Sequence, residues 1–221
     1  MTDMKIVIVN TGVGNVRSVA NMLQRLRVTA EISNSADIIR GADALILPGV
    51  GSYDAAIRRF RAAGIMDVLD EKVAREGIPA LGLCLGMQLL AEGSEEGREP
   101  GFGWIPGRLA RLPVTGAGGE LVRVPHMGWN IIRATEGCVL YDGLGEEPRF
   151  YFDHSYYFGI DNMDYVCGQV GHGIPFAAGV RRGNLFGVQF HPEKSHRFGL
   201  GLFKNFLAYA GTCGRKPLLQ S

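Results

Sequence analysis

The sequence predicts an α/β fold: a doubly wound, mainly parallel sheet with added antiparallel strands in its second half. Two observations carry this prediction. Up to about residue 93, short runs of apolar and β-branched residues alternate with helix-length segments, which is typical of parallel strands covered on both faces. Beyond that point, short strand-like runs follow one another with few helical signals between them, as antiparallel strands do.

The parallel strands are expected where an apolar run stops at a glycine, a proline or a polar residue. They cover residues 5–10, 28–33, 44–47 and 79–83. Helices are expected between and after them, where apolar residues recur at helical spacing or a glycine closes the segment. These helices cover residues 16–26, 53–60, 65–76 and 85–92.

The second half is expected to extend the sheet with short antiparallel strands and to end in one amphipathic helix. The strands are expected at residues 108–112, 121–124, 130–133, 150–152, 166–170, 176–181 and 185–190. The helix is expected at 200–210. We therefore expect a single domain over residues 1–210 and a flexible tail over residues 211–221.

Composition excludes several classes of protein. The chain has 221 residues, 46% hydrophobic residues and a net charge of +1, so neither nucleic-acid binding nor an acidic tail is indicated. No apolar run approaches the ~20 residues of a membrane span, and no secretory leader is seen, so the expected location is the cytoplasm and no membrane is involved. Four cysteines without a Cys-x-x-Cys pair predict neither a zinc site nor a disulfide framework.

The loops at the ends of the predicted strands are where a site is expected, because ligands of open α/β sheets bind outside the carboxyl ends of the strands. These loops are residues 11–15, 48–52, 84–86 and 191–193. The third holds Cys84 between Gly82 and Gly86, at the junction of a strand and a helix, which is the cysteine form of a nucleophile elbow. A helix N-terminus favours the thiolate, so Cys84 is a candidate nucleophile, although a buried structural cysteine is an equally common reading of this pattern.

The second candidate is the pair His191 and Glu193, which flank Pro192 at the end of a predicted strand. A thiolate nucleophile needs a base, and that base needs an acceptor to orient it. Residues two apart in an extended segment project to the same side, so Glu193 is expected to hold the imidazole of His191. A solvated surface pair is the alternative for this short motif taken alone.

The third candidate is the loop Pro48-Gly49-Val50-Gly51-Ser52. Acyl transfer needs two N–H donors aimed at the developing oxyanion. Leu85, directly after the nucleophile, supplies one, and the glycines of this loop allow Val50 or Gly51 to supply the other. Gln88 lies one helical turn beyond Cys84 and on the same face, where its amide could bind a polar substrate.

A competing motif follows the first strand, where Gly12 and Gly14 partly match a dinucleotide-binding fingerprint. Its third glycine position is occupied by Arg17, whose side chain would obstruct helix–sheet packing. Nucleotide binding is therefore disfavoured.

Three segments, LGLCLGMQL at 81–89, FGVQFHPE at 186–193 and LPGVGS at 47–52, resemble the class I, triad-type glutamine amidotransferases, whose fold is flavodoxin-like. Two more, PHMGWN at 125–130 and YFDHSY at 151–156, resemble the glutaminase subunits of imidazole glycerol phosphate synthases. The resemblance covers about residues 4–208. It implies that glutamine is hydrolysed to glutamate and ammonia through a cysteine thioester, without metal or organic cofactor. The ammonia would pass to a separate cyclase subunit, in a heterodimer of histidine biosynthesis.

The resemblance also assigns roles to single residues. It makes Cys84 the nucleophile, His191 the base and acid, and Glu193 its orienting partner. The positions that match substrate contacts are Gly51, Gln88, His154, Ser155 and Tyr156. The positions that match the partner-facing surface are Asn15, Trp129, Tyr151 and Lys194.

Three departures bear on the ammonia acceptor. Asn10 stands where the family commonly has aspartate, and Asp153 where an apolar residue is usual. Residues 194–199 resemble a paralogous group that feeds ammonia to a sugar-modifying synthase of surface-polysaccharide pathways, and this acceptor stays an alternative. A cysteine peptidase on the same sheet and a regulatory module without activity are two further alternatives. The sequence shows no sign of the peptide groove that a peptidase needs. The intact Cys84, His191 and Glu193 argue against a module without activity.

Overall fold

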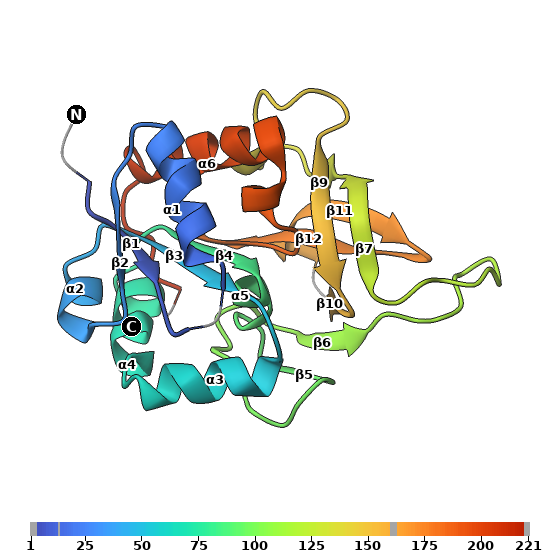
Figure 1. The fold of residues 1–221 in the computed structure, drawn as a ribbon, viewed down its shortest axis with the longest axis horizontal. Helices are drawn as coiled ribbons and strands as arrows, with labels where there is room; N and C mark the ends of the chain where they lie inside the picture. The colour runs from blue at the N-terminus through green and yellow to red at the C-terminus, as the bar shows by residue number, and fades with distance from the viewer. Residues whose placement is uncertain (1–3, 13, 160–162, 219–221) are drawn as a thin grey trace.

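A parallel sheet forms the centre of the molecule in the computed structural model, which describes residues 4–12, 14–159 and 163–218 (Figure 1). Its five strands lie in the order β2, β1, β3, β4, β13, and every adjacent pair is parallel. Their bounds are β1 Ile6–Val9, β2 Ala30–Ser33, β3 Ala44–Gly49, β4 Ala80–Cys84 and β13 Leu185–Val188. The strands other than the edge strand β2 are buried throughout, as continuous apolar runs predict.

Helices cover both faces of this sheet, which confirms the predicted fold class (Figure 1). On one face lie α1 (Val16–Arg25) and α6 (His196–Ala210), and on the other lie α2 (Ala36–Arg40), α3 (Tyr53–Ala62) and α4 (Met66–Leu69). Alternation along the strands divides the core in two. Ile6 and Ile8 of β1 pack with α1 and α6, whereas Val7 and Val9 pack with α3 and α4.

The second half adds antiparallel strands, as predicted, but the run at 185–190, expected among them, forms β13, which pairs parallel with β4 and is antiparallel only to β12. β12 (Ile174–Arg182) pairs with β13, and the sheet continues through β10 (Tyr156–Gly159) and β6 (Arg108–Arg111) to β5 (Gly93–Ser94). β11 (Val166–His172) pairs with β12 and with β8 (Arg133–Ala134). A separate two-stranded sheet of β7 (His126–Ile131) and β9 (Arg149–His154) stands at the end of the molecule opposite β2 (Figure 1).

Several expected elements differ in extent. The helix after Cys84, α5 (Leu85–Gln88), stops well short of residue 92, because the carbonyls of residues 89–91 accept backbone hydrogen bonds from the loop at residues 102–105. The segment 65–76 divides into α4 and the π-helical turn η1 (Asp70–Arg75). Residues 121–124 form one bridge rather than a strand, and α2 and β10 were not expected. Short 3₁₀ turns complete the chain: η2 Val139–Tyr141, η3 Met163–Tyr165 and η4 Pro192–Lys194.

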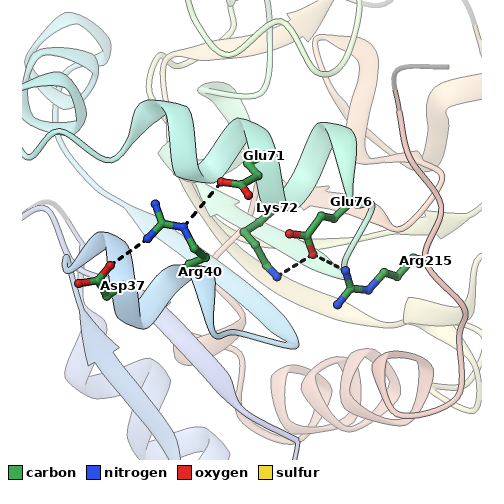
Figure 2. Close-up of polar contacts among 6 residues, drawn as sticks. All are labelled: Asp37, Arg40, Glu71, Lys72, Glu76 and Arg215. Carbon is green, nitrogen blue, oxygen red and sulfur yellow. Dashed lines mark hydrogen bonds and ion pairs between the residues drawn. The ribbon is translucent and has the colours of Figure 1, made fainter. Parts of the chain in front are cut away.

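The C-terminal segment differs from the expected flexible tail, since the structure holds it against the body as far as Leu218. The backbone N–H of Lys216 donates to Gly77 O at 3.0 Å, and the N–H of Leu218 donates to Ala74 O at 2.8 Å. Figure 2 shows Arg215 and Lys72 converging on the carboxylate of Glu76. Leu218 is only 8% exposed, so apolar burial and these polar contacts together anchor the segment. Residues 219–221 lie outside the described part of the chain.

Candidate active site

A cavity of about 320 Å³ lies at the carboxyl ends of β3 and β4, where the sequence places the site. Most of the predicted residues line it: Val50, Gly51, Cys84, Leu85, Gln88, His154, Ser155, Tyr156, His191 and Lys194. A larger hollow of about 700 Å³ lies beside β6, β10 and β12, and none of the described residues that line it is a predicted site residue. The smaller cavity is therefore the candidate site, because it alone gathers the predicted reactive groups.

Cys84 occupies a strained backbone conformation between β4 and α5. Its φ of +52° and ψ of −112° are unusual for a residue that carries a side chain. The turn depends on close backbone approach: a Cβ on Gly82 would lie 2.7 Å from Gly86 O, and a Cβ on Gly86 would lie 1.7 Å from Leu47 O. The two glycines therefore allow the elbow that places the thiol at the start of α5, only 6% exposed.

His191 and Glu193 lie beside this thiol. Glu193 Oε1 is 2.8 Å from His191 Nδ1, and the other imidazole nitrogen is free to hydrogen-bond with Cys84. The expected side-by-side projection along an extended strand is wrong in detail, because residues 192–194 form the 3₁₀ turn η4 and curl the carboxylate back onto the ring. The backbone N–H of His191 donates to Tyr151 O at 2.8 Å, which ties this turn to β9.

The electrostatics of the site favour a protonated imidazole at His191. Burial lowers the pKa of His191, but its hydrogen bonds with Cys84 and Glu193 and the charges of both groups outweigh burial and raise this pKa to about 10. A protonated His191 next to the nucleophile can donate its proton to a leaving group. Glu193 is nearly inaccessible as well, so the hydrogen bond to the ring operates away from water.

The loop after β3 comes close to the elbow, as an oxyanion site requires. A Cβ on Gly49 would lie 2.7 Å from Gly86 N, so the backbones of the two loops pack directly together. Gly51 has a φ of +102°, which a residue with a side chain would rarely adopt. The loop thereby presents Val50 and Gly51 to the same cavity as Leu85, so their backbone N–H groups are candidates for holding an oxyanion.

The predicted substrate-contacting residues divide into two kinds. Gln88 is buried, and its Nε2 donates to Tyr156 O at 3.0 Å and to Gln189 Oε1 at 3.1 Å. His154 lines the cavity, but its ring nitrogens hydrogen-bond to His126 and to Tyr156 O rather than facing open space. Ser155 and Tyr156 form the adjoining wall.

Two residues that sequence reasoning missed also belong to the site. Glu96 lines the cavity, and burial raises the pKa of its carboxyl, which the backbone N–H of Tyr53 partly offsets by hydrogen bonding. Gln189 is fully buried and places its Nε2 3.9 Å from Cys84 Sγ. Glu96 lies in a loop without a recognisable motif. Gln189 is part of the quoted segment 186–193, and its position two residues before His191 is the signal that could have found it.

The residues predicted to face a partner form a cluster beside the cavity, with one exception. The indole of Trp129 is 48% exposed, with the ring of Tyr151 6.1 Å away and the ring of His196 stacked on it. Lys194 lies 5.3 Å from the centre of the Tyr151 ring. Asn15 is exposed elsewhere, where its side chain caps α1 by accepting a hydrogen bond from Ser18 N.

Among the described residues, no group of three or more His, Cys, Asp or Glu side chains is arranged to hold a metal ion. None of the described helices is long and apolar enough to cross a membrane. Val13, in the loop that resembles a dinucleotide fingerprint, lies outside the described residues, and the side chain of Arg17 in the same motif is exposed.

Comparison with known proteins identifies similar chains. The family profile described as "Glutamine amidotransferase class-I" matches residues 7–209. The "Imidazole glycerol phosphate synthase subunit HisH" of Bdellovibrio bacteriovorus is 43% identical over 90% of this chain and 97% of that protein. The "Imidazole glycerol phosphate synthase subunit HisH 2" of Pseudomonas aeruginosa is 46% identical over 91% and 98%. A solved structure described as a glutamine amidotransferase superimposes with a TM-score of 0.72 at 24% identity, over 93% of this chain and 99% of that one, and shows the shared fold.

Proposed function

Because the chain belongs to the class-I glutamine amidotransferases, among them to the family of HisH subunits, we propose that it is the glutaminase subunit of an imidazole glycerol phosphate synthase. In this role it hydrolyses glutamine to glutamate and ammonia, for use in histidine biosynthesis. The observation that carries the proposal is that His191 lies in one cavity with Cys84, hydrogen-bonded to its thiol, while Glu193 behind it holds the imidazole. These three residues come from two strand ends that are more than a hundred residues apart in the chain.

The proposed reaction begins with attack of the Cys84 thiolate on the carboxamide carbon of glutamine, which forms a C–S bond and an oxyanion. The backbone N–H of Leu85, with that of Val50 or Gly51, stabilises this oxyanion. Collapse of the intermediate breaks the C–N bond while protonated His191 gives its proton to the departing ammonia. The neutral imidazole then takes a proton from water, whose oxygen attacks the thioester, and glutamate is released as the thiol reforms.

We propose that the substrate is oriented by polar groups on the opposite walls of the cavity. Both N–H groups of the Gln88 amide are engaged, so its carbonyl oxygen is the atom it can offer to glutamine. The carboxylate of Glu96 is placed to attract the α-ammonium group, because burial strengthens the attraction of opposite charges. Gly51, Ser155 and Tyr156 supply the remaining contacts.

A partner is required if the ammonia is to be used rather than lost. We propose that a cyclase subunit docks over the cluster of exposed Trp129, half-buried Tyr151 and Lys194, of which Lys194 also lines the cavity, and forms a heterodimer with this chain. An exposed aromatic group bordered by a cation is a composition favoured at interfaces. We propose Asn15 as a further residue that contacts the cyclase subunit. The cytoplasm is the proposed location, which suits a chain with four free cysteines.

The experiment that tests the proposal measures glutamate and ammonia released from glutamine, with and without the cyclase. Cys84→Ala is expected to abolish release, because no other group can form the thioester. The matched control is Cys213→Ala, since Cys213 lies beyond the end of α6, with its thiol bonded to Ala210 O. Undiminished hydrolysis by Cys84→Ala would refute the nucleophile assignment.

A second acceptor stays open for this glutaminase: a sugar-modifying synthase of surface-polysaccharide pathways. One observation favours it, namely the sequence of residues 194–199. Transfer of amide-labelled nitrogen from glutamine distinguishes the two acceptors. Label in imidazole glycerol phosphate with a histidine-pathway cyclase supports the first proposal, and label only in the product of the sugar-modifying synthase supports the second.

A further inference from the structure

Two buried histidines face each other across the two-stranded sheet beside the active site. His126 of β7 and His154 of β9 are directly paired in the strand register, and both side chains are buried. His126 Nδ1 lies 3.1 Å from His154 Nε2. The mechanism proposed above uses neither ring, so their hydrogen-bonding arrangement needs its own explanation.

The surrounding groups allow only one arrangement of protons on these rings. Asn130 is oriented by two backbone contacts, since its Oδ1 accepts from Ile131 N at 2.8 Å and its Nδ2 donates to Gly171 O at 3.0 Å. Its Nδ2 also lies 3.3 Å from His126 Nε2, which must therefore be an acceptor. The proton of His126 is then on Nδ1 and is donated to His154 Nε2.

The tautomer of His154 follows from that of His126. His154 Nε2 accepts from His126, so its proton is on Nδ1, which lies 2.8 Å from Tyr156 O. A carbonyl oxygen can only accept, so both ends of the chain require the same tautomer. Both rings are consequently neutral, because a second proton on either would place two N–H groups face to face.

The chain continues from Tyr156 O to the nucleophile. The same carbonyl oxygen accepts from Gln88 Nε2, whose other proton goes to Gln189 Oε1 at 3.1 Å. Gln189 Nε2 in turn points to Cys84 Sγ at 3.9 Å. A continuous set of hydrogen bonds therefore runs from Asn130, next to the exposed Trp129, to the sulfur of Cys84.

We propose that His126 and His154 are positioning residues, a neutral pair of fixed tautomer that orients the Tyr156 carbonyl, the Gln88 amide and, through Gln189, the donor to the Cys84 sulfur. The inference rests on the proposed glutaminase function and adds to it a buried support for the substrate-binding amide. It also gives His154 a different role from the substrate contact expected from the sequence.

Burial, more than the charges nearby, keeps the pair neutral. Burial, then the nearby His154 and His172, lower the pKa of His126 to about 3. Burial lowers the pKa of His154 to about 4; the hydrogen bond to Tyr156 O partly opposes it, and the nearby His172 and His191 lower this pKa a little further. His172 of β11 stacks on His126 at 4.2 Å between ring centres, but its Nε2 hydrogen-bonds to Arg123 O, outside the chain that leads to Cys84.

The direct test is long-range ¹H–¹⁵N correlation NMR of the full chain with labelled histidine. Five signals are expected, and single His→Asn variants assign them. We expect both His126 and His154 as the Nδ1–H tautomer at pH 7, and both still neutral at pH 5.5. An Nε2–H tautomer for either ring, or protonation of either above pH 5.5, would overturn the proposal.

Kinetics of the complex with its cyclase then test positioning. His126→Phe keeps the ring stacking but removes the donor to His154, and we expect kcat to fall about tenfold with a smaller change in KM. His126→Asn restores a donor at the Nδ1 position and should recover most of kcat. His172→Phe, the matched control, should stay within about twofold of the unmodified enzyme.

Equal impairment of His126→Asn and His126→Phe, or of His172→Phe and His126→Phe, would show that packing alone matters and would overturn the proposal. Urea midpoints identify variants whose loss of kcat reflects unfolding. The NMR experiment needs neither substrate nor partner, so it reads the histidine pair even if glutamine is not the substrate. Failure of the proposed function is instead seen as absence of glutamine hydrolysis by the unmodified complex.

Discussion

Substitution of Gly86 by alanine should separate the geometry of the elbow from the stability of the fold. The added Cβ would lie 1.7 Å from Leu47 O, whereas real Cβ atoms essentially never approach closer than 3.0 Å. The start of α5 and the end of β3 must therefore move apart by at least 1.3 Å, the difference of these two distances. Neither neighbour is a flexible side chain, so the backbone itself must shift.

The expected changes in stability and in kcat of Gly86→Ala follow from two effects. Overpacking of this kind costs about 1–3 kcal/mol, less than the total stability of about 5–15 kcal/mol of a typical domain, so Gly86→Ala should still fold. A shift of about 1 Å at a reacting group costs on the order of a hundredfold in rate. Because Gly86 adjoins Leu85 and Cys84, we expect kcat to fall by about that factor.

The assay is glutamine hydrolysis in the presence of the cyclase, together with urea unfolding of the same preparations. Gly118→Ala is the matched control, because its Cβ would meet only the carboxylate end of the exposed Glu120 side chain, at 3.0 Å. This control should retain activity and the urea midpoint. Equal kcat and equal midpoints for the two variants would refute the account of the elbow.

Three further predictions concern the triad, the buried histidines and the C-terminal segment. Glu193→Gln should lower kcat at least tenfold and lower the pKa of His191, because the imidazolium loses its carboxylate partner; a pH–rate profile identical to that of the unmodified enzyme would contradict this. The depressed pKa values of His126 and His154 mean that the folded state binds fewer protons than the unfolded state between about pH 3 and 6.5. The stability that these groups contribute is therefore present above about pH 6.5 and is lost as the pH falls below it. Between pH 7 and 4.5, the free energy of unfolding measured in urea should fall less for His126→Phe than for the unmodified chain. An equal fall would argue against burial of a neutral His126. Ending the chain at Gly214 should lower the free energy of unfolding by about 2 kcal/mol, mainly through the lost burial of Leu218, and an unchanged urea midpoint would show that the segment contributes nothing.

Much of the site could be anticipated because its signals are local. The motif of the elbow at Cys84 spans five consecutive residues, and the motif that contains His191 and Glu193 spans three. Both stand directly after apolar runs that predict strands, and the structure makes both strands parallel neighbours, which brings their carboxyl ends to one edge. Local pattern and sheet topology were therefore enough to bring the three residues together.

Other parts depended on partners that are distant in sequence. The helix after Cys84 was expected to reach residue 92, but carbonyls of residues 89–91 bond to a loop that no periodicity links to them. The tail beyond residue 211 has no strong pattern of its own, yet Leu218 is buried and Arg215 pairs with the carboxylate of Glu76, directly after η1. Contacts of this kind depend on long-range packing, which local propensity does not encode.

The sequence by itself determined the fold class, the elbow and the identity of the groups expected to react. Only the tertiary structure decided how those groups are supported. The pairing of His126 with His154 depends on the register of β7 against β9, and a shift of one residue would turn both rings to the other face. Likewise, Gln189 reaches Cys84 and Glu96 reaches the cavity because strand order and loop path bring them there. Proton positions on the histidine pair follow from that register, since each tautomer is set by a neighbour from another segment of the chain.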